Sequence, residues 1–389
     1  MKKPRVVFPY TEAGFGHIMP MNSIADKFEE MYGDKTECIR SQFFTENGDK
    51  KLAKLEDRFK KDVVASNKST LYGHIQTMSM DFFKTRLSIW GAMTFTAMGS
   101  KKSGIRHMDE LKPDLVVSTH FSTNYYAVNC KSKPLTAVYF PDIIVNPMYM
   151  YPCDLVLVAS DMGYERALKR NKRRFNKQNL AHVPFLIRKE AFEVKESKTE
   201  LRRKLGFDEN KFTVMLAEGG YGLGKMEKIC EIILKRDLPV TLIAVCGKNK
   251  KLYEKFKGLK SKGHTDFRPV GLSDNMFELL ACSDIFCGKS GASMAAEPCF
   301  FGVPHIITKY SSGIERDNGN YYIKNVGSAM KIFKPAKVAD KIEEFMKNPE
   351  KLKPYSDSAK NRRAEYGAEE SAKRIFELLK TRFPELGEN

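Results

Sequence analysis

Two glycine-rich segments follow short apolar runs, and this pattern can bind phosphate. Gly14-Phe15-Gly16 follows the run Arg5–Pro9, and Gly219–Gly224 follows Phe212–Ala217. Glycines let the backbone approach a phosphate, and the helix that comes next offers N–H groups and the positive end of its dipole. The second segment lacks the spaced G-x-G-x-x-G pattern, and no acidic residue closes the next apolar run near Val245. NAD is therefore not indicated.

The segment from Asp284 to Pro304 carries the most informative pattern. A buried strand is expected to end in a turn of small residues, Ser290, Gly291 and Ala292, and Glu297 follows one to two turns into the next helix. The N–H groups of such a turn can hold a diphosphate, and a carboxylate can accept hydrogen bonds from both hydroxyls of a ribose. The sequence contains no D-x-D metal motif and no P-loop.

Apolar runs of strand character alternate with helical spacing along all 389 residues. This alternation favours parallel doubly wound sheets, and the length suits two domains. We predict an α/β protein with two Rossmann-like domains facing a cleft, namely 1–190 and 191–356, and a C-terminal helix in 357–389 that packs back on the first domain. The expected strands are Arg5–Pro9, Asp114–Ser118, Thr136–Phe140, Leu155–Val158, Phe212–Ala217, Val240–Val245, Asp284–Cys287 and Pro304–Thr308.

Five segments taken together resemble glycosyltransferase family 28, the group that contains the monogalactosyldiacylglycerol synthases and the processive diacylglycerol glucosyltransferases. The resemblance is close over about residues 200–325 and loose over the first domain. The segments are Leu201-Arg-Arg-Lys-Leu-Gly-Phe-Asp, the Gly219–Gly224 loop, Ala244-Val-Cys-Gly-Lys-Asn-Lys-Lys, Val270-Gly-Leu, and the block from Ser290 to Pro304.

The resemblance implies a GT-B-like fold and a UDP-sugar donor bound on the second domain. It places Glu297 on the ribose, and Gly219, Gly220, Ser290, Gly291 and Ala292 on the diphosphate. The base would contact the backbone at Leu272, and Asp317 and Asn320 would bind the sugar hydroxyls. Arg316 stands where the family usually has glutamine, so the sequence does not identify the sugar. No metal is expected, because the sequence contains no D-x-D motif, and no other cofactor is expected beside the UDP-sugar, which is a co-substrate.

The resemblance assigns the acceptor side to the first domain, with Gly14 and Gly16 in its loop. Transfer with inversion requires a base that takes the proton of the acceptor hydroxyl. Glu12 and His17 are the two candidates, with Glu12 preferred, and His17 could instead only cap its helix. His120 follows a strand whose end faces the same edge, although a structural histidine explains it equally well.

The net charge of +18 favours anionic surfaces. Residues 82–108 hold an apolar segment with the only tryptophan, Trp90, and with Lys101 and Lys102 after it. This composition predicts either a segment at the membrane surface or an ordinary buried helix. No apolar run reaches the ~18 residues that span a membrane. We therefore expect a cytoplasmic protein bound peripherally to the inner face of the cell membrane, and no nucleic-acid partner.

These observations predict an inverting, metal-independent hexosyltransferase. It would move a hexose from a UDP-sugar to a membrane lipid hydroxyl, with diacylglycerol as the first choice of acceptor. Two alternatives remain open: transfer to a polyprenyl-linked or soluble acceptor, and a sugar-nucleotide epimerase of the same fold.

Overall fold

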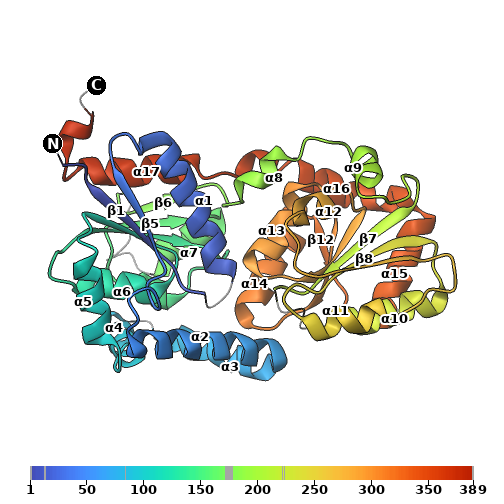
Figure 1. Cartoon of the computed structure of the whole chain (residues 1–389), viewed down its shortest axis with the longest axis horizontal. Coiled ribbons are helices and arrows are strands. Elements are labelled where there is room, and N and C mark those ends of the chain that lie inside the picture. Colours follow the sequence, from blue (N-terminus) through green and yellow to red (C-terminus); the bar gives the residue numbers. More distant parts are fainter. Residues whose placement is uncertain are drawn as a thin grey trace. The chain divides into compact units, whose positions relative to one another are not determined.

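The computed structural model describes residues 2–12, 15–83, 85–170, 178–220, 222 and 224–387. The chain forms two compact units (Figure 1). Unit 1 comprises Met1–Ala65, His74–Arg188 and Tyr366–Asn389, and unit 2 comprises Ser66–Gly73 and Lys189–Glu365. The C-terminal tail is thus shared: the stretch up to Glu365 belongs to unit 2, and the last helix belongs to unit 1.

Unit 1 contains a sheet of six parallel strands in the order β2-β1-β3-β4-β5-β6. Its central strands are the short apolar runs of the sequence, whereas the two edge strands β2 and β6 were not expected. The strands are β1 (Arg5–Pro9), β2 (Glu37–Ser41), β3 (Leu115–Ser118), β4 (Leu135–Phe140), β5 (Leu155–Val158) and β6 (Leu180–His182).

Helices cover both faces of this sheet, and each face has its own apolar core. On one face α1 (Phe15–Tyr32) packs with the C-terminal helix α17 (Glu369–Lys380). The rings of Tyr32 and Phe376 stack there with their centroids 3.8 Å apart. The helices that supply the other face are α2 (Lys50–Lys68), α4 (Arg86–Thr96), α5 (Lys101–Glu110), α6 (Phe121–Asn129) and α7 (Asp161–Arg170).

Unit 2 contains a second sheet of six parallel strands, in the order β12-β11-β10-β7-β8-β9. The four expected strands form its centre, and β9 and β12 are again edge strands that were not expected. The strands are β7 (Phe212–Ala217), β8 (Val240–Val245), β9 (Asp266–Val270), β10 (Ile285–Lys289), β11 (His305–Lys309) and β12 (Ala329–Lys331).

Helices also cover both faces of the second sheet. The helix α9 begins with a capping box, in which Ser197 and Glu200 bond each other's backbone N–H groups, so its start is fixed locally. The helices of this unit are α8 (Lys189–Glu193), α9 (Lys198–Lys204), α10 (Met226–Arg236), α11 (Lys250–Lys257), α12 (Met276–Ala281), α13 (Ala292–Phe300), α14 (Gly313–Tyr321), α15 (Pro335–Lys347) and α16 (Lys353–Lys360).

In each sheet the strand order reverses once. The reversal lies between β1 and β3 in unit 1 and between β7 and β10 in unit 2. Connections leave in opposite directions at such a point, so the carboxyl ends of the two strands border an open crevice where ligands of open α/β sheets usually bind. The residues that directly follow these four strands are therefore the first candidates for ligand binding.

The apolar segment of residues 82–108 folds as α4 and α5. Ile89 and Met93 are buried in the core of unit 1, as the ordinary-helix alternative predicts. Leu87 and Phe95 are exposed instead, at 76% and 63%. The helix therefore presents apolar side chains both to the core and to the outside. Within the part of the chain that the structure describes, no helix is both long and apolar enough to cross a membrane.

Replacing Phe376 by alanine tests the assignment of α17 to unit 1. The ring is 6% exposed and stacks on Tyr32, so the variant should lose about 3–5 kcal/mol of unfolding free energy, the usual cost of a large buried ring. Urea unfolding followed by circular dichroism measures this loss. The control is Glu377→Ala on the same helix, whose side chain is 64% exposed. Equal losses in the two variants would contradict the packing.

Candidate functional site

The loop after β7 is held by a buried carboxylate. Glu218 is 2% exposed, and its Oε1 accepts hydrogen bonds from the backbone N–H of Lys225, at 2.7 Å, and the hydroxyl of Thr308, at 3.1 Å. A Cβ atom at position 224 would lie 1.8 Å from the Glu218 carboxylate, so only glycine fits there. This arrangement curls the chain around Glu218, and Gly219 adopts a φ of +77°, which favours glycine.

The turn after β10 leads into α13, whose first residue follows Gly291. Its N-cap residue is Gly291, which has no side chain to cap the helix. The first N–H groups of a helix have no partner within the helix, and here they follow directly after the small-residue turn. A Cβ atom at Gly219 would lie 3.7 Å from the sulfur of Met294 on α13, so the β7 loop and the start of α13 are neighbours. Ser290, Gly291, Ala292 and Gly219 are thus gathered around one helix start, a position where proteins can bind anions.

Glu297 and Leu272 lie at the same carboxyl edge of the sheet. Glu297 is half-buried on α13, between one and two turns from the helix start. Leu272 follows β9 and is 72% exposed. Gly220 lies in the β7 loop, and its carbonyl accepts a hydrogen bond of 2.8 Å from the N–H of Lys248, which fixes the loop against β8.

Helix α14 packs closely on the Ser290 turn. The Ser290 hydroxyl donates a hydrogen bond of 2.7 Å to the carbonyl of Glu315, and a Cβ atom at Gly319 would lie 2.9 Å from that hydroxyl. Asp317 and Asn320 are three residues apart on this helix and so share one side of it. Asp317 forms an ion pair of 3.3 Å with Arg316, the residue that departs from the family pattern.

Two lysines at this edge were missed by the sequence analysis. Lys289 ends β10 with its side chain 7% exposed, and its Nζ lies 3.8 Å from the Glu315 carboxylate. Lys309 ends β11, and burial, together with the charge of Lys289, lowers the pKa of Lys309. Both lysines close buried apolar runs, and Glu218 follows a third. A polar residue at the carboxyl end of a buried parallel strand is the signal that could have identified all three.

In unit 1, the strand reversal is bordered by His17 after β1 and Thr119 after β3. The Nδ1 of His17 lies 2.7 Å from the carbonyl oxygen of Thr119, and the Thr119 hydroxyl donates a hydrogen bond of 2.8 Å to the carbonyl of His17. A carbonyl can only accept, so Nδ1 carries the proton and Nε2 carries the lone pair in the neutral ring. Burial lowers the pKa of His17 below its usual value. The side chain of His17 therefore does more than cap α1.

His120 has the structural role that the sequence left open as an alternative. Its Nδ1 accepts a hydrogen bond from the N–H of Ser122 at the start of α6 and lies 2.6 Å from the Ser122 hydroxyl. Burial and the nearby His17 ring, 4.8 Å away, lower the pKa of His120 well below its usual value. His120 is therefore a neutral cap that packs edge-on against His17.

Glu12 is engaged by a lysine that is distant in the sequence. Its carboxylate forms an ion pair of 3.0 Å with Lys60 and accepts a hydrogen bond of 2.8 Å from Gln42. Burial opposes the charge of Lys60, but hydrogen bonds to Glu12 and to the buried Glu56 raise the pKa of Lys60. Gly16 begins the first turn of α1 and is exposed, while Gly14 lies outside the described residues.

Residues 225–375 match the glycosyltransferase family 28 C-terminal domain. The match covers most of unit 2 and continues into α17 of unit 1. The resemblance drawn from the sequence is confirmed, and the matched range includes the turn at Ser290, Glu297 on α13, and α14.

Three relatives carry glycosyltransferase names. The chain is 23% identical over 335 residues to monogalactosyldiacylglycerol synthase 1 of Arabidopsis thaliana, covering 82% of this chain and 61% of that protein. It is 26% identical over 171 residues to the processive diacylglycerol β-glucosyltransferase of Bacillus pumilus, covering 44% of each. It is 30% identical over 204 residues to the N-acetylglucosamine transferase of Aquifex aeolicus that acts on pyrophosphoryl-undecaprenol, covering 50% of this chain and 54% of that protein. The chain thus spans about half the length of the relatives it matches.

Solved structures share the fold over nearly the whole chain. MurG of Acinetobacter baumannii superposes with a TM-score of 0.59 at 12% identity, covering 97% of this chain and 100% of that chain. A UDP-N-acetylglucosamine 2-epimerase from Listeria monocytogenes, titled as putative, superposes with a TM-score of 0.60 at 14% identity, covering 99% and 98%. These likenesses confirm the expected GT-B-like α/β fold and, at such low identity, carry nothing further.

Replacing Glu218 by alanine should destabilise unit 2 without touching a solvent-facing group. The variant leaves the Lys225 N–H and the Thr308 hydroxyl without their acceptor, which costs about 1–3 kcal/mol for each buried group. A lower urea midpoint in circular dichroism measures the effect. The matched control is Glu227→Ala, because that side chain is 44% exposed and pairs only at the surface. If both variants unfold at the same urea concentration, Glu218 does not hold the loop.

Proposed function

We propose that this protein is an inverting glycosyltransferase that moves a hexose from a UDP-sugar to a membrane lipid hydroxyl, most simply that of diacylglycerol. The observation that carries the donor half is the start of α13. A helix start without a side-chain cap follows a Ser-Gly-Ala turn, adjoins Gly219, and carries Glu297 further along the same helix. The family match over residues 225–375 supports the same assignment.

In the proposed reaction, the acceptor oxygen attacks the anomeric carbon of the sugar as the bond from that carbon to the diphosphate breaks. The leaving UDP takes the electron pair, so negative charge grows on the diphosphate. The N–H groups at the start of α13 and the ammonium group of Lys289 would stabilise this charge. Because these groups already supply positive charge, we propose that the transfer needs no metal ion. Asp317 and Asn320 would bind the sugar hydroxyls, and Leu272 the base.

We propose His17 as the base that takes the proton of the acceptor hydroxyl, in preference to Glu12. Three properties support His17. Burial lowers its pKa and so favours the neutral ring, its Nδ1–H is held by the Thr119 carbonyl, and its Nε2 then carries a lone pair. The Glu12 carboxylate, by contrast, is neutralised by Lys60. Glu12 would then keep the acceptor loop in place through its pair with Lys60, and Gly16 would border the acceptor.

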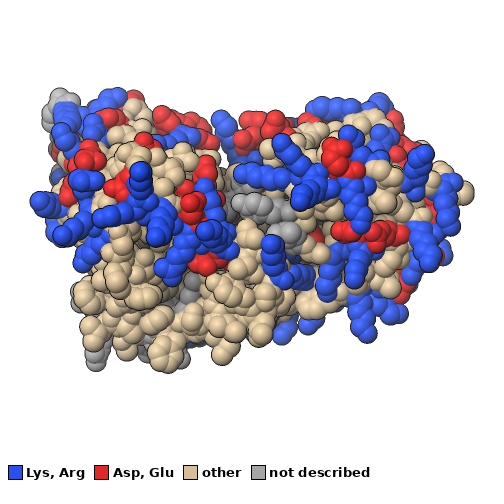
Figure 2. All heavy atoms as spheres, turned by 60° about the horizontal axis from the view of Figure 1, so that its bottom comes forward, with Lys and Arg blue, Asp and Glu red and all other residues tan. Residues whose placement is uncertain are grey.

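The exposed apolar residues of α3 (Thr70–Phe82) and α4 support a lipid acceptor. In unit 1, Ile75, Met78, Phe82, Leu87, Trp90, Phe95 and Met98 are each between 48% and 78% exposed. The face shown in Figure 2 has a broad area with few charged side chains, while lysines and arginines crowd its other parts. Lys101 and Lys102 follow on α5. Apolar side chains next to basic ones suit the surface of an anionic bilayer, so we propose peripheral binding at the cytoplasmic face.

Two other functions would fit the same donor site. The Aquifex aeolicus relative acts on pyrophosphoryl-undecaprenol, which favours a polyprenyl-linked acceptor as the second candidate. The Listeria monocytogenes structure is titled as an epimerase of UDP-N-acetylglucosamine, and an epimerase needs no acceptor. Formation of product from the donor alone would therefore identify the epimerase.

A substrate matrix tests the proposed function. The purified chain is incubated with UDP-glucose, UDP-galactose or UDP-N-acetylglucosamine, each with diacylglycerol vesicles, with a polyprenyl phosphate, or without acceptor, and products are identified by mass. A hexosyl diacylglycerol made by the wild type but not by Glu297→Ala supports the proposal. A product without acceptor, or with the polyprenyl phosphate only, refutes it.

The choice of base predicts a contrast between two variants. His17→Ala should lower kcat by about 10²–10⁴-fold, the usual contribution of a general base, with little change in the KM for the UDP-sugar. Glu12→Ala should retain most of kcat. Because the base must be neutral and burial lowers the pKa of His17, wild-type kcat should fall only at a pH lower than that at which an ordinary histidine becomes protonated. A loss confined to Glu12→Ala would reverse the assignment.

The membrane proposal predicts that acidic residues on α4 weaken vesicle binding. Leu87→Glu/Phe95→Glu should sediment much less with vesicles that contain phosphatidylglycerol, because two charges would enter the apolar layer. The control, Asn361→Glu/Ala364→Glu, makes the same change in net charge at two exposed positions of unit 2. Equal binding of the two double variants would show that charge alone, and not the apolar face of α4, brings the protein to the vesicles.

A further inference from the structure

Unit 2 has a pocket of about 780 Å³ at the opposite edge of its sheet from the Ser290 turn. Its lining includes Phe212, the first residue of β7, Pro239, which precedes β8, and Asp284, which precedes β10. These are the amino ends of the strands, whereas the candidate donor site lies at the carboxyl ends. Its volume lies within the ~300–1,000 Å³ of typical small-molecule sites. The function proposed above makes no use of this pocket.

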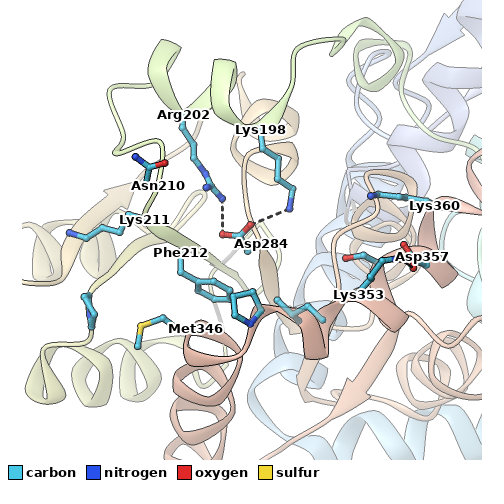
Figure 3. Close-up of a pocket in the computed structure, with 14 residues that line it drawn as sticks. Lys198, Arg202, Asn210, Lys211, Phe212, Asp284, Met346, Lys353, Asp357 and Lys360 are labelled. Carbon is cyan, nitrogen blue, oxygen red and sulfur yellow. Dashed lines mark hydrogen bonds and ion pairs between the residues drawn. The ribbon is translucent and has the colours of Figure 1, made fainter.

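One side of the pocket is strongly basic. Five lysine or arginine side chains line it against two aspartates, and Figure 3 shows Lys198 and Arg202 directed at Asp284 from above. The Asp284 carboxylate already has three partners. It pairs with Arg202 at 2.7 Å and with Lys198 at 3.3 Å, and it accepts a hydrogen bond of 2.8 Å from the Thr213 N–H. The second aspartate, Asp357, pairs with Lys353. The two aspartates do not balance the five basic side chains, so the pocket keeps a net positive charge.

Positive charge remains near Lys198, which shares the Asp284 carboxylate with Arg202, and at Lys360. Among the described residues, no carboxylate lies within ion-pair distance of the Lys360 ammonium group. Burial lowers the pKa of Lys198, Asp284 raises it, and the charges of Arg202 and Lys360 lower it again, so the three cations are close enough to repel one another. A bound anion would relieve this repulsion. Arg202 is held by the carbonyls of Cys282 and Glu209, so it stays in place as one wall of the site.

The opposite side of the pocket is apolar. Phe212 and Met346 are half-buried, Pro239 and Pro349 are exposed, and Leu352 is buried. In Figure 3, Phe212 and Met346 lie below Asp284, and Lys198 lies above it. A small hydrated anion would use only the basic side and leave the apolar side in water. An organic molecule that bears a phosphate group would cover both sides, with its charge on the lysines and its apolar part on Phe212 and Met346.

We propose that this pocket is a second ligand site, which binds an organic phosphate with its phosphate group between Lys198 and Lys360 and its apolar part on Phe212 and Met346. The two lysines lie on different elements, the start of α9 and the end of α16. Lys198 follows the passage of the chain into unit 2 at Lys189, and Lys360 precedes its return at Tyr366. An occupant therefore ties together the two segments of unit 2 that connect it to unit 1.

Calorimetric titration of the full chain with hexyl phosphate tests the site. Hexyl phosphate should bind with one-to-one stoichiometry, inorganic phosphate at least about tenfold more weakly, and hexanol not measurably. Lys360→Met removes the charge but keeps the side-chain stem, which packs against Gly302. It should weaken hexyl phosphate binding about tenfold or more, as expected for the loss of a charge-assisted hydrogen bond. Lys198→Met should act alike, and Lys337→Met, a change at a 70% exposed lysine, should have no effect.

Saturating UDP separates this pocket from the donor site. Binding of hexyl phosphate that persists in UDP supports the second site, and displacement by UDP overturns it. Unchanged affinity in both pocket variants also overturns it, as does equal binding of inorganic phosphate and hexyl phosphate, which would leave the apolar side unused. Vesicles with phosphatidic acid distinguish the source of the ligand. Lys360-dependent recruitment to them identifies a lipid headgroup, and hexyl phosphate binding without such recruitment identifies a soluble metabolite.

Discussion

The reversal of strand order in each parallel sheet is the constraint on which both candidate sites depend. Between β1 and β3, and between β7 and β10, the connecting segments leave in opposite directions. At such a point the carboxyl ends of the two neighbouring strands border a crevice in which ligands of open α/β sheets usually bind. His17 and Thr119 border the first reversal, and Gly219 and Ser290 border the second. The chemistry of this chain is thus concentrated where the topology leaves room for it.

Charged groups at these strand ends are costly to bury, and those at the ends of β7 and β10 have partners within unit 2. Glu218 accepts from Lys225 and Thr308, and Lys289 lies near the carboxylate of Glu315. Removing such groups from water is tolerable only when their charges and hydrogen bonds are matched locally. The result is a rigid rim of buried polar residues beneath the β7 loop and the Ser290 turn, which can hold the N–H groups of α13 at a fixed position for an anion.

Much of the fold was predictable because buried parallel strands appear in the sequence as uninterrupted apolar runs. The runs at Phe212–Ala217 and Val240–Val245 became strands with the expected bounds. The edge strands were missed for a physical reason. They are partly exposed, and β9 even contains Asp266, Arg268 and a proline, so apolar continuity cannot reveal them. Pairs that join distant residues were equally inaccessible. The ion pair between Glu12 and Lys60 is one reason why we propose His17 as the base, yet no residue near Glu12 in the sequence indicates this pair.

Helix α4 is apolar on two sides, and the two sides require different surroundings. Ile89, Met93 and Ala97 recur every four residues and pack into the core of unit 1. Leu87 and Phe95 lie outside that core and expose large apolar areas to water. This exposure costs about 25 cal/mol of free energy per Å² of apolar surface. This cost is removed when another apolar surface covers the two side chains. A covering surface must also accommodate the lysines at the start of α5, and an anionic bilayer offers both an apolar interior and a negative boundary. The second apolar side of α4 is therefore an argument for lipid.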